Sequence, residues 1–235
     1  MRACVVTKPG VMECVDIRPP HPGPYEALVR IDLCVICNTT DHMVINGTFP
    51  YPVRYPRVLG HETISTVIEV GQNVTSFRIG DHVTRAGFRA DAPDGGLHST
   101  WGGFADFGIA PDVAAARKAG LLSGNSQQAP QVIPPDLALR DAALLISLGE
   151  TSSFLAQVGD IRDKDVVIVG TGIVGLSMTF FAKRWGARRV TVLGRRRERL
   201  AMAAQLGADH IINTCESPKP DTDRLRTADT HRALG

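Results

Sequence analysis

Six consecutive residues, Gly170–Gly175, have the types and spacing of a turn that binds the pyrophosphate of a dinucleotide. The apolar, β-branched run Val166–Val169 comes before them, and Ile173–Gly186 has the composition of a helix. A second strand-like run follows at Arg189–Leu193. The glycines therefore fall at a strand-to-helix turn, where a phosphate-binding turn must lie. The alternative is a glycine-rich turn that binds no ligand.

Each glycine of this turn has a physical role. Gly170 allows the tight turn, Gly172 lets backbone N–H groups approach the pyrophosphate, and Gly175 lets the helix pack closely on the strand. The helix that begins at Ile173 and Val174 offers unpaired N–H donors and a partial positive charge to the phosphates. We predict that these five residues contact the cofactor.

The residues after the second strand indicate which dinucleotide is bound. Chains that bind NAD usually carry a carboxylate about 20 residues past the glycines, where it accepts hydrogen bonds from ribose hydroxyls. Here Gly194 stands at that place, and Arg195, Arg196 and Arg197 follow it. Glycine leaves room for a 2′-phosphate, and a guanidinium can bind one through two hydrogen bonds. We predict NADP, held by Gly194, Arg195 and Arg196; NAD stays open, and the arginines could instead form a solvated helix face.

A second set of residues could hold a metal ion. Cys37 lies upstream with Thr39 and His42 close behind it, and His61 and Glu62 follow further on. A thiolate and an imidazole are good zinc ligands, and catalytic zinc sites use about three protein ligands and one open position. Taken alone, a cysteine is more often a small buried apolar residue, and a distant histidine a hydrogen-bonded surface residue.

Composition excludes several classes of function. The 235 residues are 43% hydrophobic, which is enough for one large domain or two small ones. A formal net charge of +2 implies neither a nucleic-acid nor an anionic-membrane partner. No apolar run approaches the roughly 20 residues of a membrane span, and we expect the first residues to open a strand rather than a signal peptide. Five irregularly spaced cysteines argue against a secreted disulfide scaffold and predict a reducing, cytoplasmic location.

The first half of the chain is rich in short strands between proline and glycine breaks, which predicts a compact, barrel-like β domain. We expect Ala86–Gly103 to be a surface loop and Val113–Pro130 to be a poorly ordered excursion. Helical composition begins only after Asp136. The predicted strands are Ala3–Thr7, Met12–Asp16, Ala27–Leu33, Glu62–Val70 and His82–Thr84, and the predicted helices before the nucleotide turn are Leu137–Leu148 and Thr151–Val158.

These elements predict an α/β protein with two domains and a boundary near Gly149. Residues 1–149 form the β domain that carries the candidate metal ligands, and residues 150–213 form a partial dinucleotide-binding domain ending in the strand His210–Asn213. A complete domain of this kind normally has two mononucleotide halves, and this chain carries about one. Residues 214–235 have only two large apolar residues, so we expect them to be exposed and mobile.

At this point the chain resembles a known family, the medium-chain, zinc-dependent alcohol and polyol dehydrogenases. The resemblance covers about Met1 to Asn213, and it is specific because several separate stretches occur in the order of the family. It implies an N-terminal GroES-like β-barrel domain, a C-terminal Rossmann domain and an active site in the cleft between them. The stretches are MRACVVTKPG, EALVRIDLCVIC, VLGHE, EVGQNVTSFRIGDHV, GGFADF, AALL, VVIVGTGIVGLS and QLGADHIIN.

The resemblance also implies roles for individual residues. Cys37 and His61 match the ligands of the catalytic zinc, and Glu62 matches the adjacent glutamate, which is a direct or an indirect ligand depending on the subgroup. Thr39 matches the hydroxyl that takes the proton of the alcohol, and His42 matches the residue that passes it to solvent. The implied reaction is hydride transfer between a small alcohol or polyol and the nicotinamide, with Zn2+ lowering the pKa of the alcohol.

The chain departs from the family in several places. The position of the further zinc ligand appears as Ile146 or Leu148, neither of which can bind a metal, and Glu150 is the nearest carboxylate. The acidic residue that orients the zinc histidine is replaced by Thr40, so we expect Asp41, one place later, to substitute for it. The cysteines of a structural zinc lobe are absent, and residues 214–235 do not resemble the family's C-terminal part, which usually supplies the interface of a homo-oligomer.

These departures leave other functions open. One alternative is a truncated, non-catalytic fragment of the family that binds nucleotide without turnover, in which cofactor binding and stability would be low. Another is a zinc-free quinone or enone reductase of the same superfamily, although Cys37 with His61 and Glu62 argues against it. The substrate pocket cannot be identified from the sequence, so primary alcohols, secondary alcohols and polyols all remain candidates.

Overall fold

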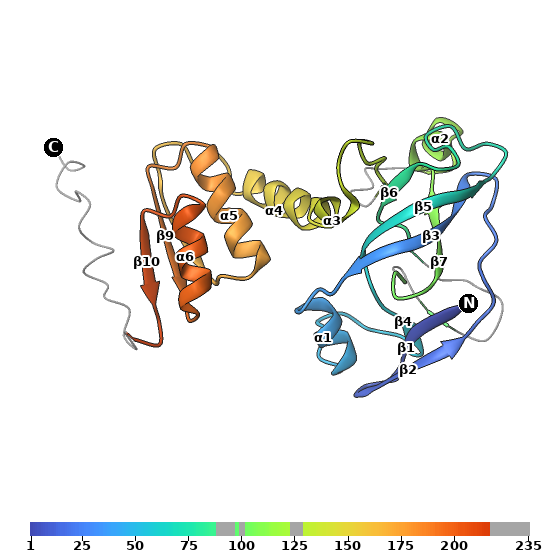
Figure 1. Ribbon diagram of the computed structural model, residues 1–235, viewed down its shortest axis with the longest axis horizontal. Helices are drawn as coiled ribbons and strands as arrows, with labels where there is room; N and C mark the ends of the chain where they lie inside the picture. The colour runs from blue at the N-terminus through green and yellow to red at the C-terminus, as the bar shows by residue number, and fades with distance from the viewer. Residues whose placement is uncertain (88–96, 99–101, 123–128, 217–235) are drawn as a thin grey trace. The chain divides into compact units, whose positions relative to one another are not determined.

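The computed structural model describes residues 1–87, 97–98, 102–122 and 129–216 (Figure 1). The chain divides into two compact units, Met1–Ile146 and Ser147–Gly235, so the division falls shortly before the expected boundary at Gly149. Most of the expected surface loop and residues 217–235 of the expected tail lie outside the described residues.

The first unit is built from two antiparallel sheets, which confirms the predicted β domain. Side chains at alternating positions along the strands point into its core. Ala27 and Val29, for example, share a buried cluster with Val67 and Val83. One sheet has the order β6-β5-β3-β7 and the other the order β2-β1-β4. The strands are β1 (Arg2–Lys8), β2 (Val11–Asp16), β3 (Glu26–Val35), β4 (Arg57–Val58), β5 (Glu62–Val70), β6 (His82–Thr84) and β7 (Phe107–Pro111).

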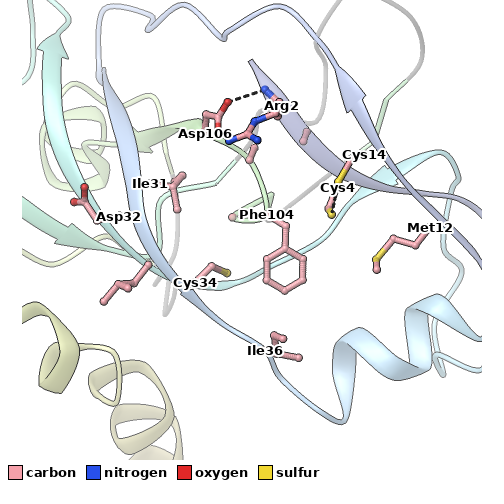
Figure 2. Close-up of a pocket in the computed structure, with 14 residues that line it drawn as sticks. Arg2, Cys4, Met12, Cys14, Ile31, Asp32, Cys34, Ile36, Phe104 and Asp106 are labelled. Atoms are coloured by element: carbon pink, nitrogen blue, oxygen red, sulfur yellow. Dashed lines mark hydrogen bonds and ion pairs between the residues drawn. The ribbon is translucent and has the colours of Figure 1, made fainter.

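A cavity of about 520 Å³ lies in this unit, lined by residues of β1, β2, the end of β3 and the 103–106 segment (Figure 2). Cys4 and Cys14 line it from the β1–β2 hairpin, and Ile31 and Cys34 line it from β3. The ring of Phe104 lies in the middle of this view. All of its lining residues belong to the first unit.

Two short helices and two strands of the first unit differ from the sequence predictions. Helix α1 (Thr40–Ile45) and strands β4 and β7 were not expected. The expectation of poor order from Val113 to Pro130 is wrong for its first part, where helix α2 (Val113–Lys118) buries Val113, Ala115 and Ala116. The small side chains that suggested disorder are good helix formers that pack closely. Residues 123–128 of the same stretch lie outside the described residues.

Helices α3 (Leu139–Ala142) and α4 (Leu145–Gln157) connect to the nucleotide strand. The predicted helices broke at Gly149, but the break lies earlier, at Ala143 and Leu144, and Gly149 is inside α4. A side chain at Gly149 would meet no atom within 4 Å, so no packing there requires a break. No helix in the described ranges is both long enough and apolar enough to cross a membrane.

The second unit is a three-stranded parallel sheet of order β10-β9-β8, which confirms an α/β fold with a partial Rossmann domain. Helices α5 and α6 contact each other and the strands, so they lie on the same face (Figure 1). Val190 and Val192 of the central strand are fully buried between the layers. The elements are β8 (Asp165–Val169), α5 (Ile173–Arg184), β9 (Arg189–Gly194), α6 (Arg197–Gln205) and β10 (His210–Asn213).

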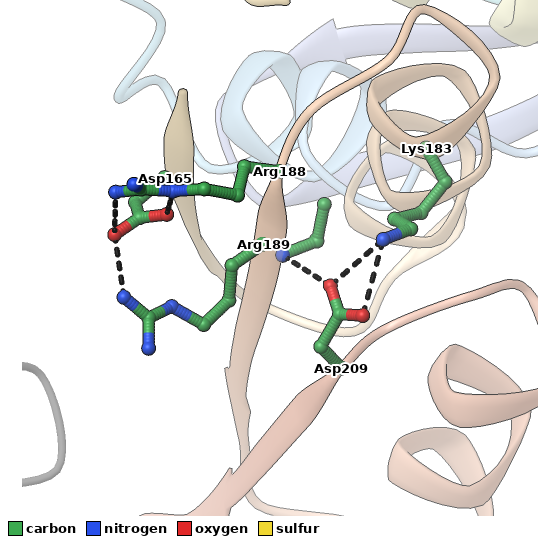
Figure 3. Close-up of polar contacts among 6 residues, drawn as sticks. Asp165, Lys183, Arg188, Arg189 and Asp209 are labelled. Carbon is green, nitrogen blue, oxygen red and sulfur yellow. Dashed lines mark hydrogen bonds and ion pairs between the residues drawn. The ribbon is translucent and has the colours of Figure 1, made fainter. Parts of the chain in front are cut away.

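The carboxylates of Asp165 and Asp209 connect neighbouring elements of this unit through hydrogen bonds (Figure 3). Asp165 of β8 accepts hydrogen bonds from Arg188 at 2.9 and 3.0 Å and from Arg189 at 2.6 Å. These two guanidinium groups lower the pKa of Asp165 to about 2. Asp209 accepts from the Lys183 ammonium at 2.9 and 3.1 Å and from the Val190 amide at 2.7 Å, which links α5, β9 and the start of β10.

Candidate functional site

The antiparallel pairing of β3 with β5 brings the candidate metal ligands together. Val35 at the end of β3 lies opposite Glu62 at the start of β5. Cys37 comes two residues after Val35 and His61 directly precedes Glu62, so both loops meet at the same end of the ladder. The ligand atoms of Cys37, His61 and Glu62 all lie within 4.8 Å of one another. The structure therefore assembles the three residues from two separate stretches of the sequence.

The backbone before His61 is fixed by close contacts with the 102–104 segment. The Gly60 carbonyl accepts hydrogen bonds from the amides of Gly102 at 2.9 Å and Gly103 at 2.8 Å. Gly60 has a φ of +89°, and a Cβ there would lie 2.8 Å from both the Cys34 sulfur and the Phe104 amide nitrogen. Only glycine suits both this conformation and this packing, so Gly60 sets the direction in which His61 enters the site.

Asp41 lies behind the site on α1. Its Oδ2 accepts a hydrogen bond from the Cys37 amide at 2.9 Å, and its Oδ1 lies 3.6 Å from Nδ1 of His61. Asp41 is buried, with 2% of its surface exposed, and its Oδ1 has no hydrogen-bond partner among the described residues. A buried carboxylate oxygen in this position can orient an imidazole, as expected for the residue that replaces the missing acid at Thr40.

The site polarises its own ligands. A hydrogen bond from His61 lowers the pKa of the Cys37 thiol, burial opposes this, and the amides of Thr40 and Thr39 reinforce it. Burial alone would lower the pKa of His61, but the nearby Asp41 carboxylate and the Cys37 sulfur raise it to about 10. Asp41 and Cys37 thus favour the protonated form of His61, and His61 favours the deprotonated form of Cys37. A divalent cation would have to displace the proton on the imidazole to bind, so binding releases a proton.

The other predicted residues have different positions. Glu62 is buried, and its Oε1 lies 3.8 Å from Nε2 of His61. Thr39 is exposed at the N-terminal end of α1, and His42 is exposed on that helix with its ring 3.2 Å from the Asn46 amide nitrogen. Glu150 lies on α4 in the second unit, so its part in metal binding stays a prediction.

The glycine turn of the second unit has the conformation that its spacing predicts. Gly170 has a φ of +111°, and its amide donates to the Leu193 carbonyl at 2.8 Å. A Cβ at Gly175 would lie 2.1 Å from the Gly170 carbonyl oxygen, so the helix approaches the strand too closely for any side chain there. A Cβ at Gly172, the residue that caps α5, would meet no atom within 4 Å, and this space is open to a ligand.

A cavity of about 300 Å³ adjoins this turn. The space that a side chain at Gly194 would need is filled by Thr171 and Leu200, so an aspartate there would not fit this packing. Sequence reasoning missed Arg199, which lies in the first turn of α6, three residues after its N-cap Arg196, and also lines the cavity. The residues around the cavity are Val169, Gly170, Thr171, Gly172, Leu193, Gly194, Arg195, Arg196, Arg199 and Thr214.

Family models match both units. Residues 23–120 match a model described as the alcohol dehydrogenase GroES-like domain, and residues 174–229 match one described as zinc-binding dehydrogenase. The second match runs past Asn213 and so includes part of the segment that we expected to differ from the family.

Individual relatives agree with these matches. The L-threonine 3-dehydrogenase of Pyrococcus horikoshii is 31% identical over 222 residues, which are 92% of this chain and 62% of that protein. The enzyme of the same name from Sinorhizobium fredii is 29% identical and aligns with 100% of this chain and 66% of its own length. The chain thus spans about three fifths to two thirds of the length of these curated relatives.

Solved structures share the fold. The apo form of zinc-dependent alcohol dehydrogenase 2 from Streptococcus pneumonia is 27% identical, with a TM-score of 0.73 over 96% of this chain and 66% of that one. A protein from Sinorhizobium meliloti described as a zinc-binding dehydrogenase, solved with NADP, is 24% identical, with a TM-score of 0.72 over 92% of this chain and 62% of that one. At this lower identity the likeness shows the fold alone.

Proposed function

We propose that this chain, which belongs to the medium-chain, zinc-dependent alcohol and polyol dehydrogenase family, transfers hydride between a small alcohol or polyol and NADP(H). The observation that carries the proposal is the convergence of Cys37, His61 and Glu62, whose ligand atoms lie within 4.8 Å of one another. The chain spans only 62% of the length of its Pyrococcus horikoshii relative. That this shorter chain carries out the reaction of a whole dehydrogenase is therefore part of the proposal.

The residues present suit a zinc ion. A thiolate, an imidazole and a carboxylate are its usual ligands, and three of them leave one position for a substrate. The buried Oδ1 of Asp41 faces Nδ1 of His61, where it would hold the ring proton and leave Nε2 for the metal. A bound zinc ion supplies Lewis-acid chemistry, which lowers the pKa of an alcohol placed beside it.

Two exposed side chains near Cys37 would move the proton of the substrate. The Thr39 hydroxyl lies two residues after Cys37 and would accept the alcohol proton, and the His42 ring would pass it to solvent. Thr39 is the N-cap of α1 and His42 lies on that helix, so both follow the candidate ligand Cys37 closely in the chain. A hydroxyl and an imidazole in series suit proton transfer from the substrate to solvent.

The nucleotide turn and the adjacent cavity would hold NADP. The open space at Gly172 would take the pyrophosphate against the amides of Ile173 and Val174, and the guanidinium groups of Arg195 and Arg196 would bind the 2′-phosphate. The packing of Thr171 against Gly194 leaves no place for the carboxylate that favours NAD.

The experiment that tests the proposal is zinc analysis of the purified chain and of Cys37→Ser. We expect about one zinc ion per chain in the wild type and a large loss in the variant, because a hydroxyl is a poor replacement for a thiolate. Cys215→Ser, which removes an exposed thiol elsewhere in the chain, is the matched control and should keep its zinc. Equal zinc in the wild type and in Cys37→Ser would remove the site.

A non-catalytic nucleotide-binding chain is the second candidate, and the exposed apolar surface around the nucleotide turn favours it. Val169 is 81% exposed, Val167 51% and Val174 49%. Such surface is normally covered by a neighbouring element. We therefore expect NADPH to bind weakly and turnover to be low unless a second chain covers this edge.

Titration with NADPH, followed by thermal denaturation, separates these two candidates. Strong stabilisation at micromolar NADPH together with turnover of an alcohol would favour the dehydrogenase. The substrates assayed should include L-threonine, because the relatives are named for it, alongside simple primary and secondary alcohols and polyols. Binding without turnover of any of these would favour the second candidate.

We also propose a cytoplasmic location for this protein, because its five free thiols suit a reducing compartment.

A further inference from the structure

Two cysteines face each other across the β1–β2 hairpin, far along the chain from any proposed zinc ligand. Cys4 of β1 is paired directly with Cys14 of β2 in the antiparallel register. Their sulfur atoms lie 3.4 Å apart, and both side chains line the cavity of the first unit (Figure 2). The two thiols are therefore already in van der Waals contact in the reduced protein.

The backbone places this pair where a disulfide can form. The Cys4 amide donates to the Phe104 carbonyl at 2.7 Å, so it points away from β2. In an antiparallel ladder this makes Cys4 and Cys14 a non-hydrogen-bonded pair, in which the Cα atoms lie about 4.5 Å apart. Disulfides span Cα separations from about 4.4 Å upward, so the bond needs little movement of the strands, although it lies at the short end of the range.

Accessibility separates this pair from the third thiol of the cavity. Cys14 is exposed and Cys4 is half-buried, so a small reagent can reach the first sulfur directly. The Cys34 sulfur is part-buried and donates to the Val35 carbonyl at 3.8 Å, so it is engaged within its own strand. In the view of Figure 2 the Phe104 ring lies between Cys34 and the pair. Cys34 is thus a poor competitor for either cysteine.

We propose that Cys4 and Cys14 form a reversible intramolecular disulfide when the protein meets a small-molecule disulfide such as oxidised glutathione. The Cys14 thiolate attacks one sulfur of the reagent and releases one glutathione thiolate, which leaves a mixed disulfide on Cys14. The Cys4 thiolate then attacks the Cys14 sulfur and releases the second glutathione. Both cysteines are oxidised, one glutathione disulfide is reduced to two thiols, and the two cysteine protons go to solvent or to the leaving thiolates.

This disulfide would be of the labile kind. An exposed bond is easier to reduce than a buried one, and the Cys14 side is exposed. In a reducing compartment the pair would stay reduced and would close only when the glutathione pool is oxidised, as redox-responsive disulfides of cytosolic proteins do. The disulfide would link β1 covalently to β2. It would also replace two thiols of the cavity wall with one disulfide.

Peptide mapping by mass spectrometry tests the proposal on the wild-type chain. After incubation with oxidised glutathione and alkylation of remaining thiols, we expect a peptide pair linked through Cys4 and Cys14, and its loss on addition of excess reduced glutathione. Cys34 should stay reduced. A glutathione mixed disulfide that persists on Cys14 while Cys4 is still alkylated would overturn the proposal, and so would links between chains in place of the internal bond.

Single variants identify the two chemical steps. In Cys4→Ser, the mixed disulfide on Cys14 should accumulate because the resolving thiol is missing, and in Cys14→Ser, Cys4 should remain largely unmodified. Cys215→Ser is the control, since it removes another exposed thiol and should leave the yield of the Cys4–Cys14 link unchanged. A link that survives in either single variant, through another cysteine, would contradict the assignment. The result is independent of zinc binding, because neither cysteine is a proposed ligand.

Discussion

Oδ1 of Asp41 lies 3.6 Å from Nδ1 of His61, although Asp41 stands one position later than the acid expected in this family. The same carboxylate accepts the Cys37 amide through its other oxygen. One buried side chain thus faces one candidate ligand and fixes the backbone of another. Asp41 occupies this place from the first turn of α1, which begins three residues after Cys37.

Asp41→Asn should weaken zinc binding by roughly 10–100-fold, which is the usual effect of losing the group that orients a ligating histidine. The asparagine oxygen can still accept the Cys37 amide, so the backbone should be preserved while the negative charge is lost. Competition with a chromophoric chelator measures the affinity. Asp136→Asn, which removes an exposed carboxylate of the same unit, serves as the control. Equal zinc affinity in Asp41→Asn and the wild type would show that Asp41 does not orient His61.

A pair of glycine variants separates folding from nucleotide binding. In Gly175→Ala the new Cβ would lie 2.1 Å from the Gly170 carbonyl, so we expect a stability loss of about 1–3 kcal/mol or more. In Gly172→Ala the Cβ meets no protein atom, and the φ of −76° suits alanine, so stability should hardly change. The methyl group would instead stand where the pyrophosphate is expected.

Urea denaturation and NADPH titration of the two variants measure these effects. Gly172→Ala should unfold like the wild type but bind NADPH more weakly. If Gly172→Ala bound NADPH as the wild type does, the pyrophosphate would not lie against this turn. If Gly175→Ala were as stable as the wild type, α5 would not pack on β8 as closely as the structure shows.

Arginines of the nucleotide cavity should decide between the two cofactors. Arg195→Ala with Arg196→Ala removes two candidate partners of a 2′-phosphate, and a hydrogen bond to a charged group contributes about 1.5–3 kcal/mol. We expect the Kd for NADPH to rise by about 10–100-fold and that for NADH to change little. Arg197→Ala is the control, since Arg197 pairs with Glu216 rather than lining the cavity. If the double variant lost affinity equally for NADPH and NADH, the arginines would contact a part that both cofactors share rather than the 2′-phosphate.

The sequence predicted the residue types of the site better than their arrangement. The strands around Ala27–Leu33 and Glu62–Val70 were readable from their β-branched residues. Their pairing was not, because register shifts between Leu28 and Val29 and between Ile31 and Leu33 move the ladder before it reaches Val35 and Glu62. Bulges of this kind change which residues meet without changing the hydrophobic pattern.

The missed elements have a different physical cause. Strand β7 contains Gly108 and Pro111, which weaken any prediction of a strand, and it is held in place by its ladder with β3. Helix α2 depends on Asp112, whose contacts come from residues 36 and 37 positions away in the sequence. A tertiary partner decides each element, and local composition does not contain that information.

Asp112 is also the source of a pH-dependent contribution to stability. It is fully buried, caps α2 by accepting the Ala115 amide at 2.9 Å, and accepts the amides of Thr75 and Ser76, both at 2.8 Å. Burial alone would raise its pKa, but these hydrogen bonds together lower it from the ordinary value of 3.8. The folded state therefore binds this proton less readily than the unfolded state does.

A depressed pKa in the folded state gives a contribution that is complete above the pKa of the unfolded chain and is lost as the pH falls toward the folded value. The free energy of unfolding should thus decline as the pH falls below about 4. Asp112→Asn should lose about 1–3 kcal/mol at neutral pH, because its amide group faces donors, and should show a shallower decline in acid. Urea denaturation at pH 3 to 7 measures both effects, with the exposed Asp136→Asn as control. If Asp112→Asn declined in acid as steeply as the wild type, other carboxylates would carry the pH dependence, and the link from Thr75 and Ser76 to α2 would not depend on the charge of Asp112.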